Sequence, residues 1–287
     1  MKYNILLSLL LFLLPLTIFS QQTPPVDDNE ATFNRYVEYI ARYRIAPLET
    51  ILEHTAHFFL GTPYVASTLD QTMDEQLVVN LQELDCVTYV ENVLALSLAA
   101  SSNNFTYHNF KEHLKSIRYR NGELSDYASR LHYTSDWIFD NEQSGLLQNI
   151  SQELSGLKET KELDFMSTHR SAYKQLAHND AMLHKIEQAE KTINNRNGFY
   201  YLPKGGIHNK ANKIPHMAVV AIVTTIDGLD TSHVGFAYQK EGELQFIHAS
   251  SAKNKVIVDS KSLSNYCFSQ KTCKGIIVAK LEARDKE

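Results

Sequence analysis

The segment Leu84-Asp-Cys-Val-Thr-Tyr-Val-Glu91 and the residues that follow it decide the fold of this chain. From Cys86 to about Leu98, apolar residues occupy nearly every side of a helix. A helix that is apolar all round must be buried, so we expect the central helix of the core to start at Cys86. Glu91 is the exception inside this helix, and we expect it to pair with a buried polar group.

The sequence pattern before this helix differs from the pattern after it. Residues 33–40 and 47–58 have helical spacing, and residues 77–81 read as a strand or extended segment. After the central helix, the chain is mostly polar and helical, with candidates at 110–117, 136–147 and 172–193. After Gly198, short β-branched runs alternate with turn residues, at 218–225, 233–238, 244–249, 256–258 and 275–281. Helices followed by antiparallel strands are typical of an α+β domain.

The composition excludes several classes of protein. The chain has 287 residues, 43% of them hydrophobic, with only 11 Gly and 7 Pro. A disordered or fibrous chain would be far richer in Gly and Pro. The formal net charge is −5, and Lys and Arg do not cluster, so nucleic acid is not an expected partner.

The N-terminus reads as a secretory signal peptide over residues 1–20, with a basic start, an apolar stretch and a small residue at the end. An uncleaved membrane anchor is the alternative, but the stretch is short for a span and Pro15 interrupts it. Residues 21–30 read as a flexible leader and 31–287 as a single domain. We expect an exported, periplasmic protein with no stable membrane span.

Cys86 is the first candidate for chemistry. Asp85 is a good N-cap residue, which would place Cys86 in the first turn of the buried helix. Free backbone N–H groups there stabilise a thiolate, can lower the thiol pKa and can hold an oxyanion. The alternative is a buried structural cysteine, the usual role of an unpaired Cys on an apolar helix.

A nucleophilic cysteine needs an imidazole base and a third group that orients the imidazole. His233 begins the strand Ser232-His-Val-Gly-Phe-Ala-Tyr238, and His248 ends the next strand. The turn at Glu241-Gly242 would make the two strands antiparallel, which places both histidines at the same edge of the sheet. Each histidine taken alone could equally be a polar residue at a strand end.

Motifs of other enzyme classes are absent from the sequence. No His-Glu-x-x-His, Cys-x-x-Cys, Gly-rich phosphate loop or Gly-x-Ser-x-Gly elbow occurs. A zinc site built from distant residues stays open as an alternative. The cysteine chemistry itself requires no metal or cofactor.

Taken together, these motifs resemble the NlpC/P60 superfamily of papain-like cell-wall hydrolases. Within it, the chain is similar to the N-acetylmuramoyl-L-alanine amidase-like branch, over about residues 45–280. The resemblance rests on the Cys86 motif, on Ser232–Tyr238 and on His248–Ser250. Shorter segments that also match are Gly61–Val65, Leu77–Leu81, Ser129–Tyr133 with Trp137, and Gly228–Asp230. It implies an α+β, papain-like core in which the central buried helix packs on an antiparallel sheet, enlarged by a helical insert at about 103–200.

The resemblance also implies an activity, hydrolysis of the N-acetylmuramoyl-L-alanine bond in peptidoglycan fragments. Cys86 would be the nucleophile, His233 the general base and acid, and His248 the residue that orients His233. Candidate substrate contacts are Tyr64, Asp85, Arg130 and Trp137, where a guanidinium can bind oxygens bidentately and an indole can pack on a sugar. Asp85 could instead only cap the helix, and Arg130 could be a salt-bridge partner.

Two other functions stay open, an endopeptidase that cuts the γ-D-Glu–diamino acid bond and a non-catalytic cell-wall binding protein. The chain departs from the family pattern at Ser67, where glycine is usual, and at His216-Met217, where the family has Gly-Asp. Three cysteines leave one unpaired if Cys267 and Cys273 form a disulfide. Their pairing and the oligomeric state are not settled by the sequence.

Overall fold

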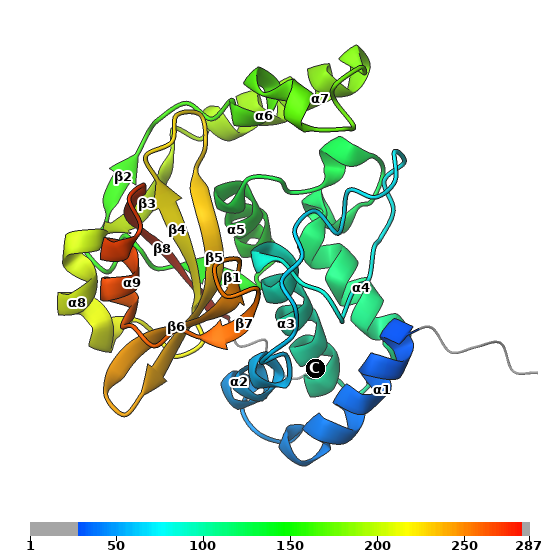
Figure 1. The fold of residues 1–287 in the computed structure, drawn as a ribbon, viewed down its shortest axis with the longest axis vertical. Coiled ribbons are helices and arrows are strands. Elements are labelled where there is room, and N and C mark those ends of the chain that lie inside the picture. The colour runs from blue at the N-terminus through cyan, green and yellow to red at the C-terminus, as the bar shows by residue number, and fades with distance from the viewer. Residues whose placement is uncertain (1–27, 283–287) are drawn as a thin grey trace, which may run out of the picture.

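The computed structural model describes residues 28–282. The expected signal peptide and residues 21–27 of the expected leader lie outside this range, while residues 28–30, also expected to belong to the leader, form the start of the first helix. One antiparallel sheet stands in the middle of the molecule, and helices cover both of its faces (Figure 1). The prediction of a mixed α and β fold with an antiparallel sheet is confirmed.

The sheet contains eight strands among the described residues, in the order β2-β3-β8-β4-β5-β6-β7, with β1 also paired to β8. The five C-terminal strands were predicted within a few residues of their ends. Four of these five strands pair with a strand on each side, and the last in the order, β7, pairs on one side. The strands are β1 (Leu147–Asn149), β2 (Leu157–Glu159), β3 (Phe199–Pro203), β4 (Val219–Thr224), β5 (Thr231–Lys240), β6 (Glu243–Ser250), β7 (Lys255–Val258) and β8 (Cys273–Leu281).

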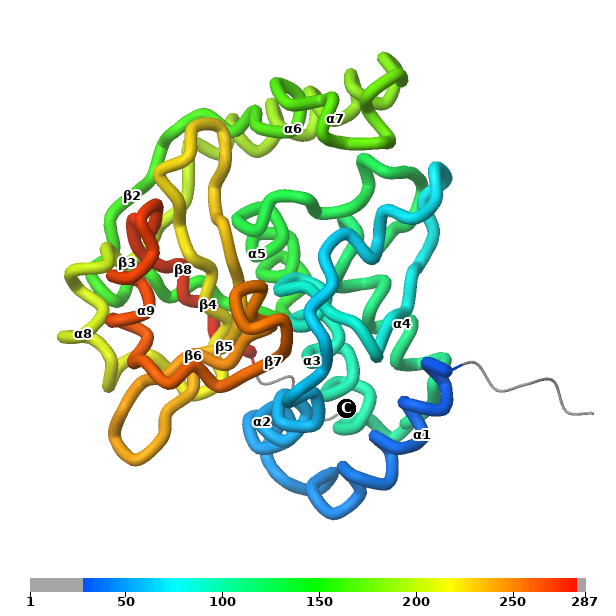
Figure 2. The backbone as a smooth tube through the Cα atoms, in the orientation of Figure 1, coloured from blue at the N-terminus to red at the C-terminus, as the bar shows by residue number. Residues whose placement is uncertain are grey.

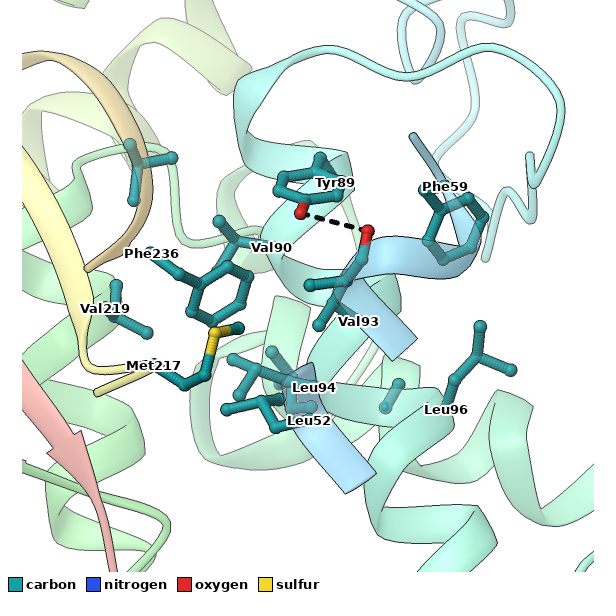
Figure 3. Close-up of a cluster of buried hydrophobic side chains, with 14 of the residues drawn as sticks. Leu52, Phe59, Tyr89, Val90, Val93, Leu94, Leu96, Met217, Val219 and Phe236 are labelled. Atoms are coloured by element: carbon teal, nitrogen blue, oxygen red, sulfur yellow. Dashed lines mark hydrogen bonds between the residues drawn. The ribbon is translucent and has the colours of Figure 1, made fainter. Parts of the chain in front are cut away.

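The first five helices lie on one side of the sheet. They are α1 (Asp28–Ile40), α2 (Leu48–Phe58), α3 (Cys86–Ser101), α4 (Tyr107–Arg118) and α5 (Thr134–Gln143). As predicted, α3 is buried nearly all round. Figure 3 shows Tyr89, Val90 and Val93 of α3 together with Leu52 of α2 and Phe236 of β5 in the main core. This packing fixes the start of α3 relative to β5.

The other face of the sheet is covered by two short helices, α8 (Ile207–Lys210) and α9 (Leu263–Ser269), over a second apolar cluster. A third cluster joins α6 (Phe165–Thr168) and α7 (Asp180–Asn194) to residues before α5. Within residues 28–282, no helix is long and apolar enough to cross a membrane.

Of the two forms expected for residues 77–81, a strand or an extended segment, the strand is not formed, and the Val78 carbonyl accepts a hydrogen bond from Arg118. Two details of the sequence prediction are wrong. The region 103–200 is not purely helical, since it supplies β1, β2 and the start of β3, and its helices α4 and α5 share the main core. The last helix predicted there begins only at Asp180, where Asn179 caps it.

The segment between α2 and α3 runs a long way past α3 before it returns to the start of that helix (Figure 2). A buried ion pair fixes this segment against α3 and α4. Glu91 pairs with Arg118 at 2.7 Å, and Arg118 donates to the Val78 carbonyl at 2.6 Å. The expected polar partner of Glu91 is therefore Arg118, from α4.

The departures at Ser67 and at His216-Met217 fall on unusual backbone. Ser67 has φ +60° and Met217 has φ +57°, in the left-handed region that favours glycine. The chain keeps this backbone conformation at both places without a glycine.

Candidate active site

Asp85 fixes the start of α3. Its carboxylate accepts a hydrogen bond from the Thr88 backbone N–H at 2.8 Å, and the Thr88 hydroxyl accepts one from the Asp85 N–H at 2.9 Å. This reciprocal capping box satisfies two backbone donors that the helix leaves free. Cys86 therefore occupies the first helical position, as predicted.

The Cys86 thiol lies between the start of α3 and strand β5. Backbone N–H groups of Val234, Cys86 and Val87 hydrogen-bond its sulfur and lower the thiol pKa. Burial and, next, the Asp85 carboxylate outweigh them and raise this pKa to about 12. The helix start therefore does not lower the pKa of the Cys86 thiol as expected, because burial and the Asp85 carboxylate outweigh the effect of its N–H groups.

His233 and His248 meet at the edge of the sheet. His233 Nε2 lies 2.6 Å from His248 Nδ1, and the two rings are almost perpendicular. The register explains the contact: β5 and β6 are antiparallel, with Phe236 opposite Ile247. Burial, and for His233 also its neighbour His248, lowers the pKa of His233 to about 3; burial lowers that of His248 to about 4. The predicted juxtaposition of the two histidines is confirmed.

Cys86 reaches the same place through its contact with Val234, the residue after His233. The start of α3 and the start of β5 are thus in contact, although Cys86 and His233 are about 150 residues apart in the sequence.

Three residues that the sequence analysis did not single out shape the histidine pair. Gly235 leaves room for His248, because a Cβ on this glycine would lie 2.8 Å from the His248 Cβ. The Phe246 ring stacks on His248, and the Tyr266 ring of α9 lies 5.3 Å from His248 and 6.3 Å from His233. Of these three residues, only Gly235 could have been found from the sequence, because it belongs to the His-Val-Gly-Phe motif.

A cleft of about 700 Å³ opens beside the two histidines. Asp259, Tyr266 and several serines line it. Three lysines also line it, and none of the three forms an ion pair within the described part of the chain: Lys253, Lys255 and Lys261. This group carries no sequence signal, because Lys253 lies in the turn before β7, Lys255 at the start of β7 and Lys261 in the bend after it.

Tyr64 and Asp85 both lie beside Cys86. The Gly61–Val65 loop is joined to the start of α3 by hydrogen bonds from Leu84 to Pro63 and from Val65 to Leu84. Burial, followed by Cys86 and Asp85, raises the pKa of Tyr64 to about 12. The Tyr64 hydroxyl is therefore protonated near the sulfur and can donate a hydrogen bond.

Arg130 occupies a different position from the one expected for a substrate contact. It is buried and donates to Glu75 at 2.6 and 3.0 Å and to Asp70 at 2.8 Å. Its side chain fixes the segment between α2 and α3, so the salt-bridge alternative describes it. The expectation that Arg130 contacts substrate is wrong, because Glu75 and Asp70 occupy its guanidinium.

Trp137 is also misassigned by the sequence analysis. Its side chain is only 4% exposed and packs in the main core, where no sugar ring can reach it. It does border Val87 and Val234, the residues after Cys86 and His233, in a small cavity of about 20 Å³. Trp137 therefore supports the site from behind.

The other two cysteines form no second candidate active site with acidic residues in the described part of the chain. Cys267 and Cys273 are buried free thiols in hydrogen-bond contact with each other. Across residues 28–282, no three His, Cys, Asp or Glu side chains come together as metal ligands.

Comparison with known proteins identifies the family. The family model of AmiA-like, N-acetylmuramoyl-L-alanine amidase-like proteins matches residues 54–276, which contain both histidines and Cys86. No curated protein matches the chain.

Solved structures agree with this match. An N-acetylmuramoyl-L-alanine amidase from Bacteroides uniformis is 33% identical, with a TM-score of 0.75, over 82% of this chain and 99% of that one. A protein from Bacteroides fragilis described as a candidate xylanase is 35% identical, with a TM-score of 0.74, over 79% and 99%. A Legionella pneumophila protein, 24% identical with a TM-score of 0.68 over 90% and 95%, shares the fold. The chain belongs to the AmiA-like family of N-acetylmuramoyl-L-alanine amidase-like proteins.

Proposed function

We propose that this protein is a papain-like cysteine amidase of the NlpC/P60 type, which hydrolyses the bond between the lactyl group of N-acetylmuramic acid and L-alanine in peptidoglycan fragments. The observation that carries the proposal is one juxtaposition. The Cys86 sulfur, at the start of α3, lies beside the Val234 backbone N–H of β5, and His233, the residue before Val234, pairs with His248 at 2.6 Å. Nucleophile, base and orienting group are the three parts that such a mechanism needs.

The first step forms a bond between the Cys86 sulfur and the lactyl carbonyl carbon. Burial keeps the thiol protonated and His233 neutral, so the thiol proton passes to His233 while the bond forms. The backbone N–H groups of Cys86 and Val87 point at the sulfur, and the Cys86 N–H stabilises the oxyanion of the tetrahedral intermediate. The protonated Tyr64 hydroxyl is a further donor for that oxygen.

The second half of the reaction returns the enzyme to its starting state. The carbon–nitrogen bond breaks as His233 gives its proton to the alanine amine. Water then attacks the thioester with His233 as base, the carbon–sulfur bond breaks, and the proton returns to Cys86. His248 keeps the His233 ring in place throughout.

The charge of the cleft supports a peptide with free carboxylates as substrate. Lys253, Lys255 and Lys261 line the cleft that begins at the histidine pair, although the chain as a whole has a net charge of −5. A local cationic cleft on an acidic protein attracts anionic ligands. The stem peptides of peptidoglycan fragments carry such carboxylates.

The test is incubation of the purified protein with defined muropeptides, followed by mass analysis of the products. The amidase releases a free sugar moiety and a peptide that starts with L-Ala, whereas the endopeptidase leaves a dipeptide on the sugar. Cys86→Ala should abolish the release, and turnover by that variant would overturn the cysteine mechanism. Binding of muropeptides without any turnover by the wild-type protein would favour the non-catalytic alternative.

Two controls address the remaining alternatives. A zinc amidase would lose activity in a chelator, while the cysteine amidase should not. Xylan serves as the second control because one structural relative is described as a candidate xylanase. We expect no reducing sugar from it.

A further inference from the structure

One polar atom of the site has no hydrogen-bond partner in the described part of the chain. His248 is 1% exposed, and its Nε2 is buried and unpaired, whereas its Nδ1 is 2.6 Å from His233. A buried ring nitrogen without a partner is unfavourable by roughly 1–3 kcal/mol. Asp259 Oδ2 lies 3.7 Å from this nitrogen, just beyond hydrogen-bond distance.

The position of Asp259 is fixed independently of His248. Its backbone N–H donates to the Phe246 carbonyl at 2.7 Å, and its Oδ1 accepts from the Lys261 N–H at 2.8 Å. One carboxylate oxygen is therefore used by the turn after β7. The other, Oδ2, is the oxygen near His248.

The hydrogen bond between the two rings determines which nitrogen of each histidine can carry the proton, and therefore what the Asp259 oxygen can bind. His233 Nε2 is engaged with His248, so only Nδ1 of His233 is left to take a proton from the Cys86 thiol. A neutral imidazole carries one proton, which on His233 must then sit on Nε2 and point to His248 Nδ1. His248 in turn must carry its own proton on Nε2, the atom beside Asp259.

The opposite arrangement would block catalysis. With its proton on Nδ1, His248 would donate to His233 Nε2, and the His233 proton would sit on Nδ1 where the thiol proton has to go. The lone pair of His248 Nε2 would then face the Asp259 carboxylate, which is unfavourable electrostatically. Only one of the two tautomers suits both the carboxylate and the reaction.

We propose that Asp259 is a positioning residue, which accepts a hydrogen bond from His248 Nε2 and thereby selects the tautomers in which His233 can receive the Cys86 proton. The inference rests on the proposed cysteine mechanism. The proposal requires only a small shift of the two side chains, from 3.7 Å to hydrogen-bond distance.

Other groups face the same place and have to be kept constant in a test. Tyr266 of α9 covers both histidines, and three lysines line the same cleft: Lys253, Lys255 and Lys261. Substitutions at Asp259 leave all of them in place.

Asp259→Asn is the informative variant. The amide oxygen can still accept from the Lys261 N–H, so the turn is kept, while the amide NH₂ would donate to His248 Nε2 and favour the unproductive tautomer. We expect kcat to fall by about 10-fold or more with KM little changed, and the pH profile of kcat/KM to shift. Asp259→Glu, which keeps a carboxylate, should recover part of kcat. Asp227→Asn, at an exposed aspartate before β5, is the matched control.

Nitrogen-15 NMR of the histidine rings tests the tautomer directly and does not depend on turnover. The wild-type protein should carry the His248 proton on Nε2, and Asp259→Asn should move it to Nδ1 at an unchanged melting temperature. An unchanged proton position in Asp259→Asn, together with wild-type kcat, would overturn the inference. If the wild-type protein fails to cleave muropeptides, the proposed function falls, while the NMR result still decides the role of Asp259.

Discussion

Gly235 lies directly against His248: a Cβ built on this glycine would lie 2.8 Å from the His248 Cβ and 2.7 Å from the Ile247 carbonyl oxygen. Real Cβ contacts are not this short, so any other residue must push β5 and β6 apart. The histidine pair sits where the two strands begin to separate. The glycine therefore sets the 2.6 Å contact on which the proposed mechanism depends.

Gly235→Ala should accordingly reduce activity and stability together. Overpacking of this kind costs about 1–3 kcal/mol of unfolding free energy. Gly205→Ala is the control, because a Cβ there meets no atom within 4 Å. Urea unfolding and kcat/KM would be measured for both. Wild-type stability and turnover of the Gly235→Ala protein would contradict this prediction, because β5 and β6 could then separate at little cost.

Two substitutions of His248 isolate the contribution of its hydrogen bond to His233. Asparagine places an acceptor oxygen near the position of His248 Nδ1, whereas alanine leaves the N–H at His233 Nε2 without a hydrogen-bond acceptor. We expect kcat/KM to fall by about 10²–10⁴-fold in His248→Ala and by less in His248→Asn. Equal activity of the two variants and the wild type would remove His248 from the site.

Much of this site could be predicted from the sequence because its members stand on regular elements. Cys86 follows a good N-cap at the start of an apolar helix, and the histidines stand at the ends of two strands joined by a short turn. Antiparallel pairing places the start of one strand beside the end of the next, so the contact between the two histidines follows from the order of the strands.

The substrate contacts were less predictable because they depend on loop packing. Arg130 is held by Glu75 and Asp70, which are more than 50 residues away in the sequence. Trp137 and Asp259 likewise acquire their surroundings only when distant elements come together. The short strands β1 and β2 were missed for a related reason, since three residues that pair at a sheet edge carry no periodic signal of their own.

The buried pair Glu91–Arg118 should control stability rather than chemistry. Glu91→Gln leaves the Arg118 guanidinium, which is 1% exposed, without a compensating charge. We expect a loss of about 3–5 kcal/mol in the free energy of unfolding. Glu112→Gln is the control, because its pair with Lys115 is exposed and should contribute less than about 1 kcal/mol. Chemical denaturation of both variants checks this, and similar losses would contradict it.

The buried histidines predict loss of stability in acid. The pKa values of His132 and His233 are lowered to about 3 and that of His248 to about 4, mainly by burial. Below the unfolded value of about 6.5, the unfolded chain binds more protons than the folded chain, so the free energy of unfolding falls as the pH drops from there toward 3–4. His132→Asn should flatten this dependence, and the exposed His178→Asn should not. Thermal melts between pH 7 and 4 measure it; identical slopes would contradict the assignment.

The three cleft lysines should act on substrate binding and leave the chemical step alone. They are exposed and pair with no acid in the described residues, so each contributes through screened attraction of about 0.2–1 kcal/mol, or up to about 5-fold in KM. Replacing Lys253, Lys255 and Lys261 together by glutamine should raise KM for muropeptides, leave kcat near wild type and weaken the dependence of KM on salt. Lys158→Gln is the control, since β2 lies at the opposite edge of the sheet from β7. If KM and its salt dependence stay unchanged in the triple variant, the anionic peptide does not bind along this cleft.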